Sequence, residues 1–250
     1  MTGPMDALVA EVTALLANAP GVQGVLSLGA FDDFPGMAGA LFTAITATPA
    51  LGALVAATYR ADPDLSAMTL YDIAETARRN FEPGGAAATF LFARGAQAVM
   101  AHRVAHAIWE GRARDLALAL KSVTGRALGT DIHPAAQIGA GFWLDHGLGF
   151  VAGETAIIAE DVSIWHGVTL GSTLNDSGPR RHPEIGKGAV IGAGATLLGG
   201  ITIGPGANIG AGAIVVEDVP AGTLMAGPKA QARGAARISF APDARGKNPP

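Results

Sequence analysis

The spacing of aliphatic residues divides the chain into two parts. Up to about Leu128, apolar residues recur every three or four positions within alanine-rich segments, as at Met5, Leu8 and Val12. This spacing is typical of amphipathic helices. Prolines interrupt the pattern, as expected for helices joined by short loops: Pro20, Pro35, Pro49, Pro63 and Pro83. Residues 1–128 are therefore predicted to form a helical domain.

From Ile132 onward the period changes to six, which neither a helix nor an ordinary alternating strand explains. The most regular stretch carries an aliphatic residue at every sixth position: Ile185, Ile191, Leu197, Ile203, Ile209 and Val215. Such hexapeptide repeats are typical of a parallel β-helix, in which each repeat supplies one short strand and one tight corner. The aliphatic side chains then stack inside a narrow prism, with neighbouring coils about 4.8 Å apart. Residues 129–232 are predicted to form this domain, so the expected fold class is α+β.

Two segments of the second half do not fit inside the prism. Residues 172–184 are polar and contain Arg181 and His182. We expect a surface loop there, and such loops often carry binding residues. Residues 233–250 are charged and contain proline, and they are predicted to form a disordered tail.

The composition narrows the classes of function. With 17 Lys and Arg against 21 Asp and Glu, the net charge is −4, so nucleic acid is not an expected partner. The absence of cysteine excludes disulfides and thiolate metal sites. The first residues lack the basic flank of a signal peptide, and the uncharged segment 34–59 has too few large aliphatic residues for a membrane span. We expect a cytoplasmic protein that does not bind membranes.

His146 is the first candidate for chemistry, because it interrupts the repeat within the run Leu144–Gly147. Asp131 lies fifteen residues earlier, close to one coil of about eighteen residues, so it can approach His146 from the neighbouring coil. An aspartate bound to one imidazole nitrogen would leave the other nitrogen free to act as a general base. The spacing alone equally allows a surface histidine that makes a structural hydrogen bond.

Two histidines of the helical half are candidate metal ligands. His102 and His106 lie four residues apart on a predicted helix, a spacing that suits two metal ligands. No third ligand is evident nearby, and a polar contact between helices explains the pair better. The γ-type carbonic anhydrases combine a hexapeptide helix with three zinc-binding histidines, but their closely spaced histidine pair is absent from this repeat region. No metal site is therefore predicted.

Several motifs of the second half resemble those of the serine O-acetyltransferases: Thr130–Gly139, Leu144–His146, Gly153–Ala156, Gly167–Gly171 and Arg181–Pro183. The resemblance extends from about Val104 to Val219. It implies a left-handed β-helix that forms a homotrimer, with active sites between adjacent prisms, or a dimer of trimers joined through the helical domains. It also implies transfer of an acetyl group from acetyl-CoA to L-serine, giving O-acetylserine for cysteine biosynthesis. Acetyl-CoA would be a co-substrate, and no permanently bound cofactor is expected.

The resemblance also assigns residues to the acceptor side of the site. His146 would be the general base that removes the serine hydroxyl proton, and Asp131 would orient its imidazole. Asp145 would hold the substrate ammonium group. Arg181 and His182 would hold the substrate carboxylate through charge-assisted hydrogen bonds.

On the cofactor side, the resemblance points to small residues at the corners of the coils. Ala193, Gly194, Ala211 and Gly212 would line the groove for the pantetheine arm, because the lack of side chains allows close backbone approach. Lys229 would either meet a phosphate of the cofactor or remain solvated.

The sequence departs from the family pattern at three places that matter for binding. Two of them concern binding of the acceptor substrate, and the third concerns binding of a partner protein. Glu82 stands where the family has the aspartate of an Asp-Pro pair that contacts the substrate amino group, in a segment two residues shorter. The loop before Arg181 is one residue longer. The chain ends in Asn-Pro-Pro rather than in the family's isoleucine, so no stable complex with O-acetylserine sulfhydrylase is expected.

Three functional interpretations follow. The first is a serine O-acetyltransferase. The second is an acetyltransferase of the same fold that acts on homoserine or a serine derivative, because Glu82 and the loop before Arg181 would both face the acceptor. The third is a non-catalytic hexapeptide paralogue that serves as a scaffold.

Overall fold

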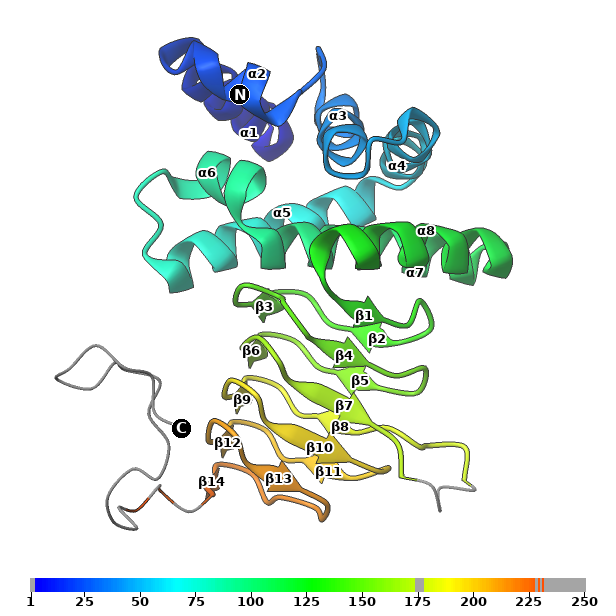
Figure 1. Ribbon diagram of the computed structural model, residues 1–250, viewed down its shortest axis with the longest axis vertical. Coiled ribbons are helices and arrows are strands. Elements are labelled where there is room, and N and C mark those ends of the chain that lie inside the picture. The colour runs from blue at the N-terminus through cyan, green and yellow to red at the C-terminus, as the bar shows by residue number, and fades with distance from the viewer. Residues whose placement is uncertain (1–2, 174–177, 228, 230, 232–250) are drawn as a thin grey trace, which may run out of the picture.

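The computed structural model describes residues 3–173, 178–227, 229 and 231. Helices form one end of the molecule, and a stack of short strands forms the other (Figure 1). The described residues do not include positions 174–177 of the polar loop or the segment 233–250 that was predicted to be a disordered tail. The prediction about the sulfhydrylase partner depends on the end of this segment and therefore also lies outside the described residues.

Eight helices lie within the described residues before position 129: α1 (Pro4–Asn18), α2 (Pro20–Leu26), α3 (Phe34–Thr46), α4 (Pro49–Ala61), α5 (Pro63–Asn80), α6 (Gly85–Phe92), α7 (Arg94–Glu110) and α8 (Arg114–Leu128). Helices α1 to α5 each carry proline in the first turn. Proline suits this position because its missing N–H has no intrahelical partner there and its φ is already helical. The helical interpretation of the first half is confirmed.

The uncharged segment folds as the helices α3 and α4, which pack backbone to backbone. A β-carbon added at Gly39 would come within 2.7 Å of the Gly52 carbonyl oxygen, and one at Gly52 would collide with Thr43. Glycine at both positions therefore permits the close approach. Within the described residues, no single helix has the length and apolar composition of a membrane span. Only α1 and α2 together meet that criterion, as a pair bent by 103°.

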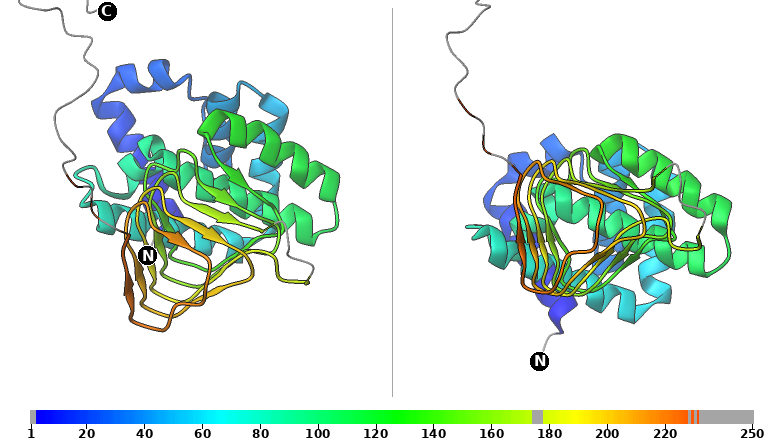
Figure 2. Two further views of the ribbon diagram at one scale, coloured as in Figure 1. Left: turned by 60° about the horizontal axis from the view of Figure 1, so that its bottom comes forward. Right: turned by 90° about the horizontal axis from the view of Figure 1, so that it is seen from below.

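Short strands follow the helices: β1 (Asp131–Ile132), β2 (Gln137–Ile138), β3 (Trp143–Leu144), β4 (Val151–Ala152), β5 (Ile157–Ile158), β6 (Ser163–Ile164), β7 (Thr169–Gly171), β8 (Glu184–Ile185), β9 (Val190–Ile191), β10 (Thr196–Leu198), β11 (Thr202–Ile203), β12 (Asn208–Ile209), β13 (Ile214–Val215) and β14 (Leu224–Met225). They pair in parallel to form three sheets, ordered β1-β4-β7-β10-β13, β11-β8-β5-β2 and β14-β12-β9-β6-β3. Each coil therefore passes through three faces of a prism, which Figure 2 shows nearly end-on. The predicted parallel β-helix is confirmed.

The predicted aliphatic ladder lies inside this prism. Its members are between 0 and 4% exposed: Ile185, Ile191, Leu197, Ile203, Ile209 and Val215. Ala189, Ala195 and Ala207 are fully buried between them. Each large aliphatic side chain buried in this way contributes about 1.5–3 kcal/mol. The six-residue period of the sequence is thus the period of the core.

The first coil is two residues longer than a regular coil of three six-residue repeats. Asp131 pairs with Val151 and Trp143 with Ser163, an offset of 20 residues. Further along, the register has an offset of 18, as between Val190 and Asn208. Because of the two extra residues, each residue of the first coil lies beside the residue 20 positions later in the chain.

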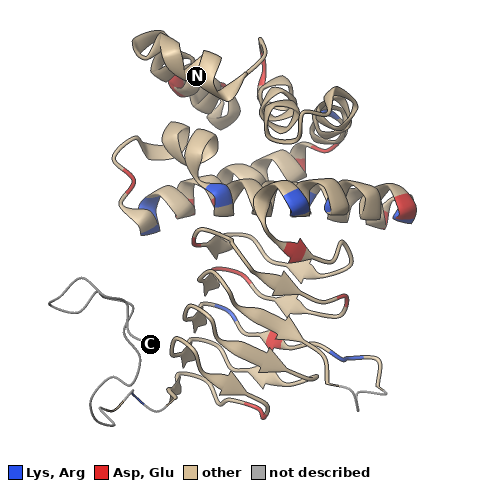
Figure 3. Ribbon diagram, in the orientation of Figure 1, with Lys and Arg blue, Asp and Glu red and all other residues tan. Residues whose placement is uncertain are grey.

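A buried polar contact joins the helices to the first coil. The Nε of Arg103 in α7 lies 2.9 Å from Oδ2 of Asp72 in α5, and Nη2 of Arg103 donates to the carbonyl of Gly139 at 2.6 Å. Asp72 also accepts hydrogen bonds from the backbone N–H groups of Gly141 and Phe142. Figure 3 shows charged residues along the helices that lie over the top of the prism. The helical end is therefore bound to the β-helix by hydrogen bonds to its backbone as well as by packing.

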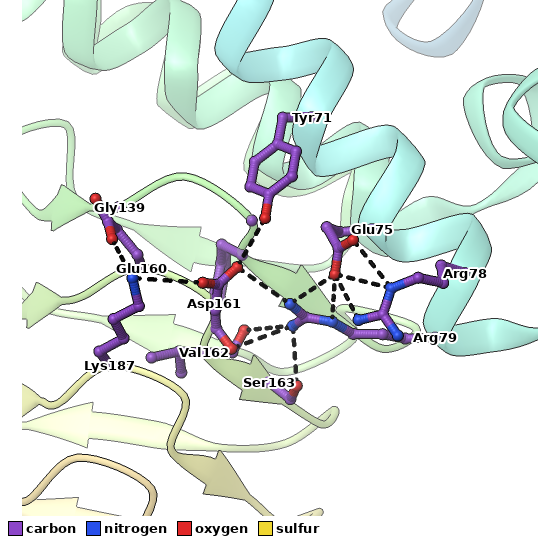
Figure 4. Close-up of polar contacts among 12 residues, drawn as sticks. Tyr71, Glu75, Arg78, Arg79, Gly139, Glu160, Asp161, Val162, Ser163 and Lys187 are labelled. Atoms are coloured by element: carbon purple, nitrogen blue, oxygen red, sulfur yellow. Dashed lines mark hydrogen bonds and ion pairs between the residues drawn. The ribbon is translucent and has the colours of Figure 1, made fainter.

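A second group of polar contacts attaches α5 to the next coil (Figure 4). Arg79 lies between Glu75, at 3.0 Å, and the hydroxyl of Ser163, at 3.1 Å. Tyr71 donates to Asp161 at 3.1 Å. These contacts fix the C-terminal half of α5, and this half leads directly to Glu82.

Candidate active site

An open cleft of about 450 Å³ lies where the helices meet the corner after β3. Its walls are the end of α5, the turn between α6 and α7, and residues 144–148. Glu82, Asp145 and His146 all line it. The structure thus brings together three of the residues that the sequence analysis placed on the acceptor side.

Close contact between α7 and the β-helix presents this corner to the cleft. Gly95, in the first turn of α7, lies directly against Leu144, and a β-carbon at position 95 would collide with the Leu144 carbonyl oxygen. The corner then turns at His146, whose φ is 59°. Such left-handed backbone is uncommon for a residue with a side chain and clusters at functional sites. The His146 side chain is 69% exposed, so a substrate can reach its imidazole.

The cleft combines charges of both signs. Oδ2 of Asp145 lies 3.5 Å from Nε2 of His146, and the Asp145 side chain is mostly buried. Glu82 adds a second carboxylate, and Arg94 adds a guanidinium group. This lining suits a small ligand that carries both an ammonium group and a carboxylate.

The Asp131 carboxylate contacts a different partner from the predicted one. Its carboxylate forms an ion pair with Lys121 of α8 and is 62% exposed, and within the described residues the carboxylate beside His146 is that of Asp145. The first coil has 20 residues, so the coil neighbour of Asp131 is Val151, which lies five residues beyond His146. The estimate of one eighteen-residue coil was wrong for this part of the chain.

Arg181 and His182 lie at a different corner of the prism, in the loop between β7 and β8. Arg181 pairs with Glu154 at 2.8 Å. Nδ1 of His182 lies 2.8 Å from the hydroxyl of Thr155, and the ring packs so close to Gly153 that a β-carbon there would overlap it. Neither residue lines the cleft that contains His146. The predicted acceptor residues therefore form two groups within one chain.

The small residues predicted for the cofactor lie at the same corner of the prism as His146. Residues 193 and 194 follow β9, and residues 211 and 212 follow β12 in the next coil. Gly194 N–H donates to the carbonyl of His166 at 2.9 Å, and Gly212 N–H donates to the carbonyl of Ala193 at 2.8 Å. A β-carbon added at Gly194 or Gly212 would meet no atom within 4 Å. Ala193, Gly194, Ala211 and Gly212 thus form an open row of small residues, hereafter the small-residue row.

Lys229 is exposed and lies four residues after β14, the last strand of the sheet that precedes this corner. The sequence is consistent with either a phosphate contact or a solvated lysine at this position. Its exposure is compatible with both.

Two residues near His146 were missed by the sequence analysis. Arg94 lines the cleft from the first position of α7. The His166 ring lies 5.6 Å from the His146 ring, centroid to centroid. His166 lies twenty residues after His146, which is the length of the first coil. This spacing indicates that the two histidines are neighbours only when the length of that coil is known.

His102 and His106 contribute to the joint between helix and β-helix. Nδ1 of His106 lies 2.8 Å from the carbonyl oxygen of Pro134. The two rings stack at 5.7 Å, and burial lowers the pKa of His102 well below its usual range. Among the described residues, the group with metal-ligand spacing does not include this pair. The polar contact is made to the first coil rather than between two helices.

The prism of six-residue repeats, with a histidine and two carboxylates beside a row of small residues, defines a hexapeptide-repeat transferase. The family described as "Bacterial transferase hexapeptide (six repeats)" matches residues 182–216. The serine acetyltransferase of Salmonella typhimurium is 41% identical over 195 residues, which cover 78% of this chain and 71% of that protein. The chain belongs to the serine acetyltransferase family.

Other relatives extend beyond this chain. Serine acetyltransferase 2 of Arabidopsis thaliana is 50% identical over 141 residues, which are 56% of this chain but 43% of the plant protein. The chain therefore spans less than half the length of that plant relative.

Solved structures match almost the whole chain. The serine acetyltransferase of Neisseria gonorrhoeae in complex with serine aligns with a TM-score of 0.80 at 33% identity, over 93% of this chain and 98% of that one. The enzyme of Brucella abortus strain S19 in complex with coenzyme A aligns with a TM-score of 0.79 at 32% identity, over 95% and 98%. The helical end and the β-helix together thus resemble complete serine acetyltransferase chains.

Proposed function

We propose that this protein transfers the acetyl group of acetyl-CoA to the hydroxyl of L-serine, giving O-acetylserine and coenzyme A. One observation carries the proposal. His146 stands in a cleft with Asp145 and Glu82, on the same corner as the small-residue row. An acceptor in the cleft and a thioester along the row would meet at the imidazole.

In this mechanism His146 acts as the general base. Its imidazole takes the proton of the serine hydroxyl while the oxygen attacks the thioester carbonyl. The carbon–sulfur bond then breaks, and the thiolate of coenzyme A receives the proton from the imidazolium. General-base catalysis of this kind contributes roughly 10²–10⁴-fold to the rate. The exposed imidazole, its left-handed backbone and the nearby Asp145 support this assignment.

The orienting role of Asp131 remains a proposal. Thr130, its neighbour in sequence, faces the turn after His146: a β-carbon at Gly147 would lie 3.6 Å from the Thr130 side chain. The Asp131 side chain is exposed and would have to turn from Lys121 toward this corner. An aspartate there would fix the imidazole tautomer.

The acceptor is proposed to bind through both of its charged groups. Asp145 and Glu82 would hold the ammonium group within the cleft. Arg181 and His182 lie at another corner of the same prism, so they would hold the carboxylate of a substrate bound to the neighbouring chain. We therefore propose a homotrimer of left-handed β-helices, or two such trimers joined through the helices, with each site shared by two prisms. Mixed trimers of His146→Ala and Arg181→Ala chains should regain activity that each variant lacks alone.

The cofactor proposal rests on the small-residue row. The pantetheine arm would run past Ala193, Gly194, Ala211 and Gly212, where no β-carbon or only a methyl group stands in the way. A β-carbon at Gly227, two residues before Lys229, would lie 3.9 Å from Ala213, the residue that follows Gly212. Lys229 is therefore proposed as a phosphate contact. The coenzyme A complex of the Brucella abortus relative supports acetyl-CoA as co-substrate. The cytoplasm remains the proposed location.

A second acceptor is favoured by one observation. Glu82 lies in the cleft together with Arg94, so the carboxylate that departs from the family pattern faces the acceptor. A longer hydroxylated amino acid such as homoserine is therefore the competing substrate. Release of coenzyme A with L-serine, D-serine, L-homoserine and L-threonine separates the two possibilities. Preference for L-serine supports the proposal, and turnover only with another acceptor keeps the mechanism but changes the substrate.

A further inference from the structure

A cluster of metal-binding groups lies at the head of the cleft. Asp145, His146 and His166 each place one potential ligand atom within 4.8 Å of the others. The first two come from the corner after β3, and His166 comes from the corner after β6, the strand paired with β3. The backbone under both corners is held by ladder hydrogen bonds, from Asp145 N–H to Ile164 O and from Trp165 N–H to Ile191 O. Two rigid coils thus hold the three side chains on one side of the prism.

The donor set points to a transition metal. Two imidazole nitrogens and one carboxylate oxygen match the catalytic-type zinc sites with three protein ligands and one open position. Imidazole donors disfavour magnesium and calcium, which take oxygen ligands. In a tetrahedral zinc site with bonds of about 2.0–2.2 Å, donor atoms lie roughly 3.3–3.6 Å apart. The Asp145–His146 pair is already 3.5 Å apart.

Only small side-chain movements are needed to close the set. His146 and His166 are both exposed, and Asp145 is the more buried member. The carboxylate therefore provides a fixed point, and rotation of the two exposed imidazoles would bring their nitrogens closer to it. The rings already lie side by side, with centroids 5.6 Å apart.

We propose that Asp145, His146 and His166 bind one Zn²⁺ ion per chain and that this ion closes the acceptor site. The second half of this inference rests on the proposed function. Zinc would take the imidazole lone pair that the general base needs and the carboxylate that receives the substrate ammonium. His166 is outside the proposed catalytic machinery, so it separates metal binding from catalysis.

Zinc binding is tested first without any reaction. Full-length protein stripped with EDTA is titrated with Zn²⁺ against a chromogenic chelator, and with Co²⁺ to record the ligand-field spectrum. The wild type is expected to bind one ion per chain and to give the intense visible bands of tetrahedral cobalt. His166→Asn should weaken binding at least tenfold and lose those bands. His106→Asn, the matched control, should leave both unchanged.

Inhibition is then measured on the same proteins. Zn²⁺ should reduce coenzyme A release in the wild type competitively with the amino acid, and His166→Asn should keep its turnover while losing most of the inhibition. Equal zinc affinity in wild type and His166→Asn, or no binding to the wild type, overturns the inference whatever the turnover. If zinc binds through His166 but metal-free protein acetylates no acceptor, the metal site stands and the proposed function fails.

Discussion

Gly95 in the first turn of α7 is in direct contact with the backbone of Leu144, the residue that enters the His146 corner. A β-carbon at position 95 would overlap the Leu144 carbonyl oxygen and come within 2.8 Å of its carbon. Because both partners are backbone, neither can rotate away. The helical end therefore sets the position of the corner on which the proposed chemistry depends.

Gly95→Ala is expected to destabilise the protein by about 3 kcal/mol, because overpacking against fixed backbone forces α7 away from the coil. It should also lower turnover by displacing Asp145 and His146. Urea unfolding and steady-state kinetics measure the two effects. Gly24→Ala in α2 is the control, because a β-carbon there meets nothing within 4 Å and alanine should leave stability unchanged or raise it slightly. Equal stability of the two variants would contradict the proposed contact.

The buried His102 predicts a dependence of stability on pH. Burial is the main cause that lowers its pKa in the folded state, and the positive charge of Arg103 lowers it further. Below about pH 6.5 the unfolded chain therefore binds a proton that the folded chain does not. The free energy of unfolding should fall as the pH decreases from 6.5, by up to about 1.4 kcal/mol per pH unit, until the folded-state pKa is reached.

His102→Leu tests this effect, because leucine cannot take up a proton in either state. Urea unfolding of wild type and variant is compared between pH 8 and pH 5. The difference between their unfolding free energies should shift in favour of the variant as the pH falls. A difference that stays constant over this range would show that His102 does not cause the acid destabilisation.

Asp131 and Asp145 should have separable roles in catalysis. Asp131→Asn is expected to lower kcat with little change in KM, because the imidazole would lose its orienting partner. Asp145→Asn is expected mainly to raise KM for the amino acid, because the ammonium group would lose a charge-assisted contact of roughly 1.5–3 kcal/mol. Steady-state kinetics with varied amino acid distinguishes these patterns.

Lys121→Met is the companion variant, because it removes the ion-pair partner that Asp131 has in the structure. If Asp131 orients His146 during turnover, loss of Lys121 should leave kcat unchanged or increase it. A loss of kcat in Lys121→Met equal to that in Asp131→Asn would instead assign the pair a structural role.

The small-residue row can be tested with two matched glycines. Gly194 and Gly188 have nearly the same left-handed φ, 68° and 67°, and a β-carbon at either would meet no atom within 4 Å. Alanine should cost each about 1–2 kcal/mol of stability for the same backbone reason. Only Gly194→Ala should raise KM for acetyl-CoA, by about tenfold, because Gly188 lies at a different corner. Equal KM values for acetyl-CoA in the two variants would show that the cofactor does not bind along the small-residue row.

Much of the fold was readable from the sequence because one rule is repeated many times. Ile185, Ile191 and Leu197 follow a period of six, and all are fully buried. The site was harder to predict because it depends on where the repeat is broken. Leu148 and Gly149 lie in the longer corner that makes the first coil 20 residues long, and this length was not evident from the six-residue period.

Other parts of the site depend on contacts between distant segments. Glu82 and Arg94 reach the cleft only because α5 and α7 pack on the first coils, and no spacing along the chain encodes that docking. His166 becomes a neighbour of His146 through the pairing of β3 with β6. Glu82 lines the cleft from the segment between α5 and α6, whereas Arg181 lies at another corner of the prism. Their separation likewise follows from the fold and not from any local motif.

The most direct test of the account is formation of O-acetylserine from acetyl-CoA and L-serine by the purified wild type and by His146→Ala, followed by mass spectrometry and coenzyme A release. We predict that the wild type forms O-acetylserine and that His146→Ala loses at least about 10²-fold in kcat while remaining folded. Formation of O-acetylserine at an undiminished rate by His146→Ala, or its absence with the wild type, would contradict the account.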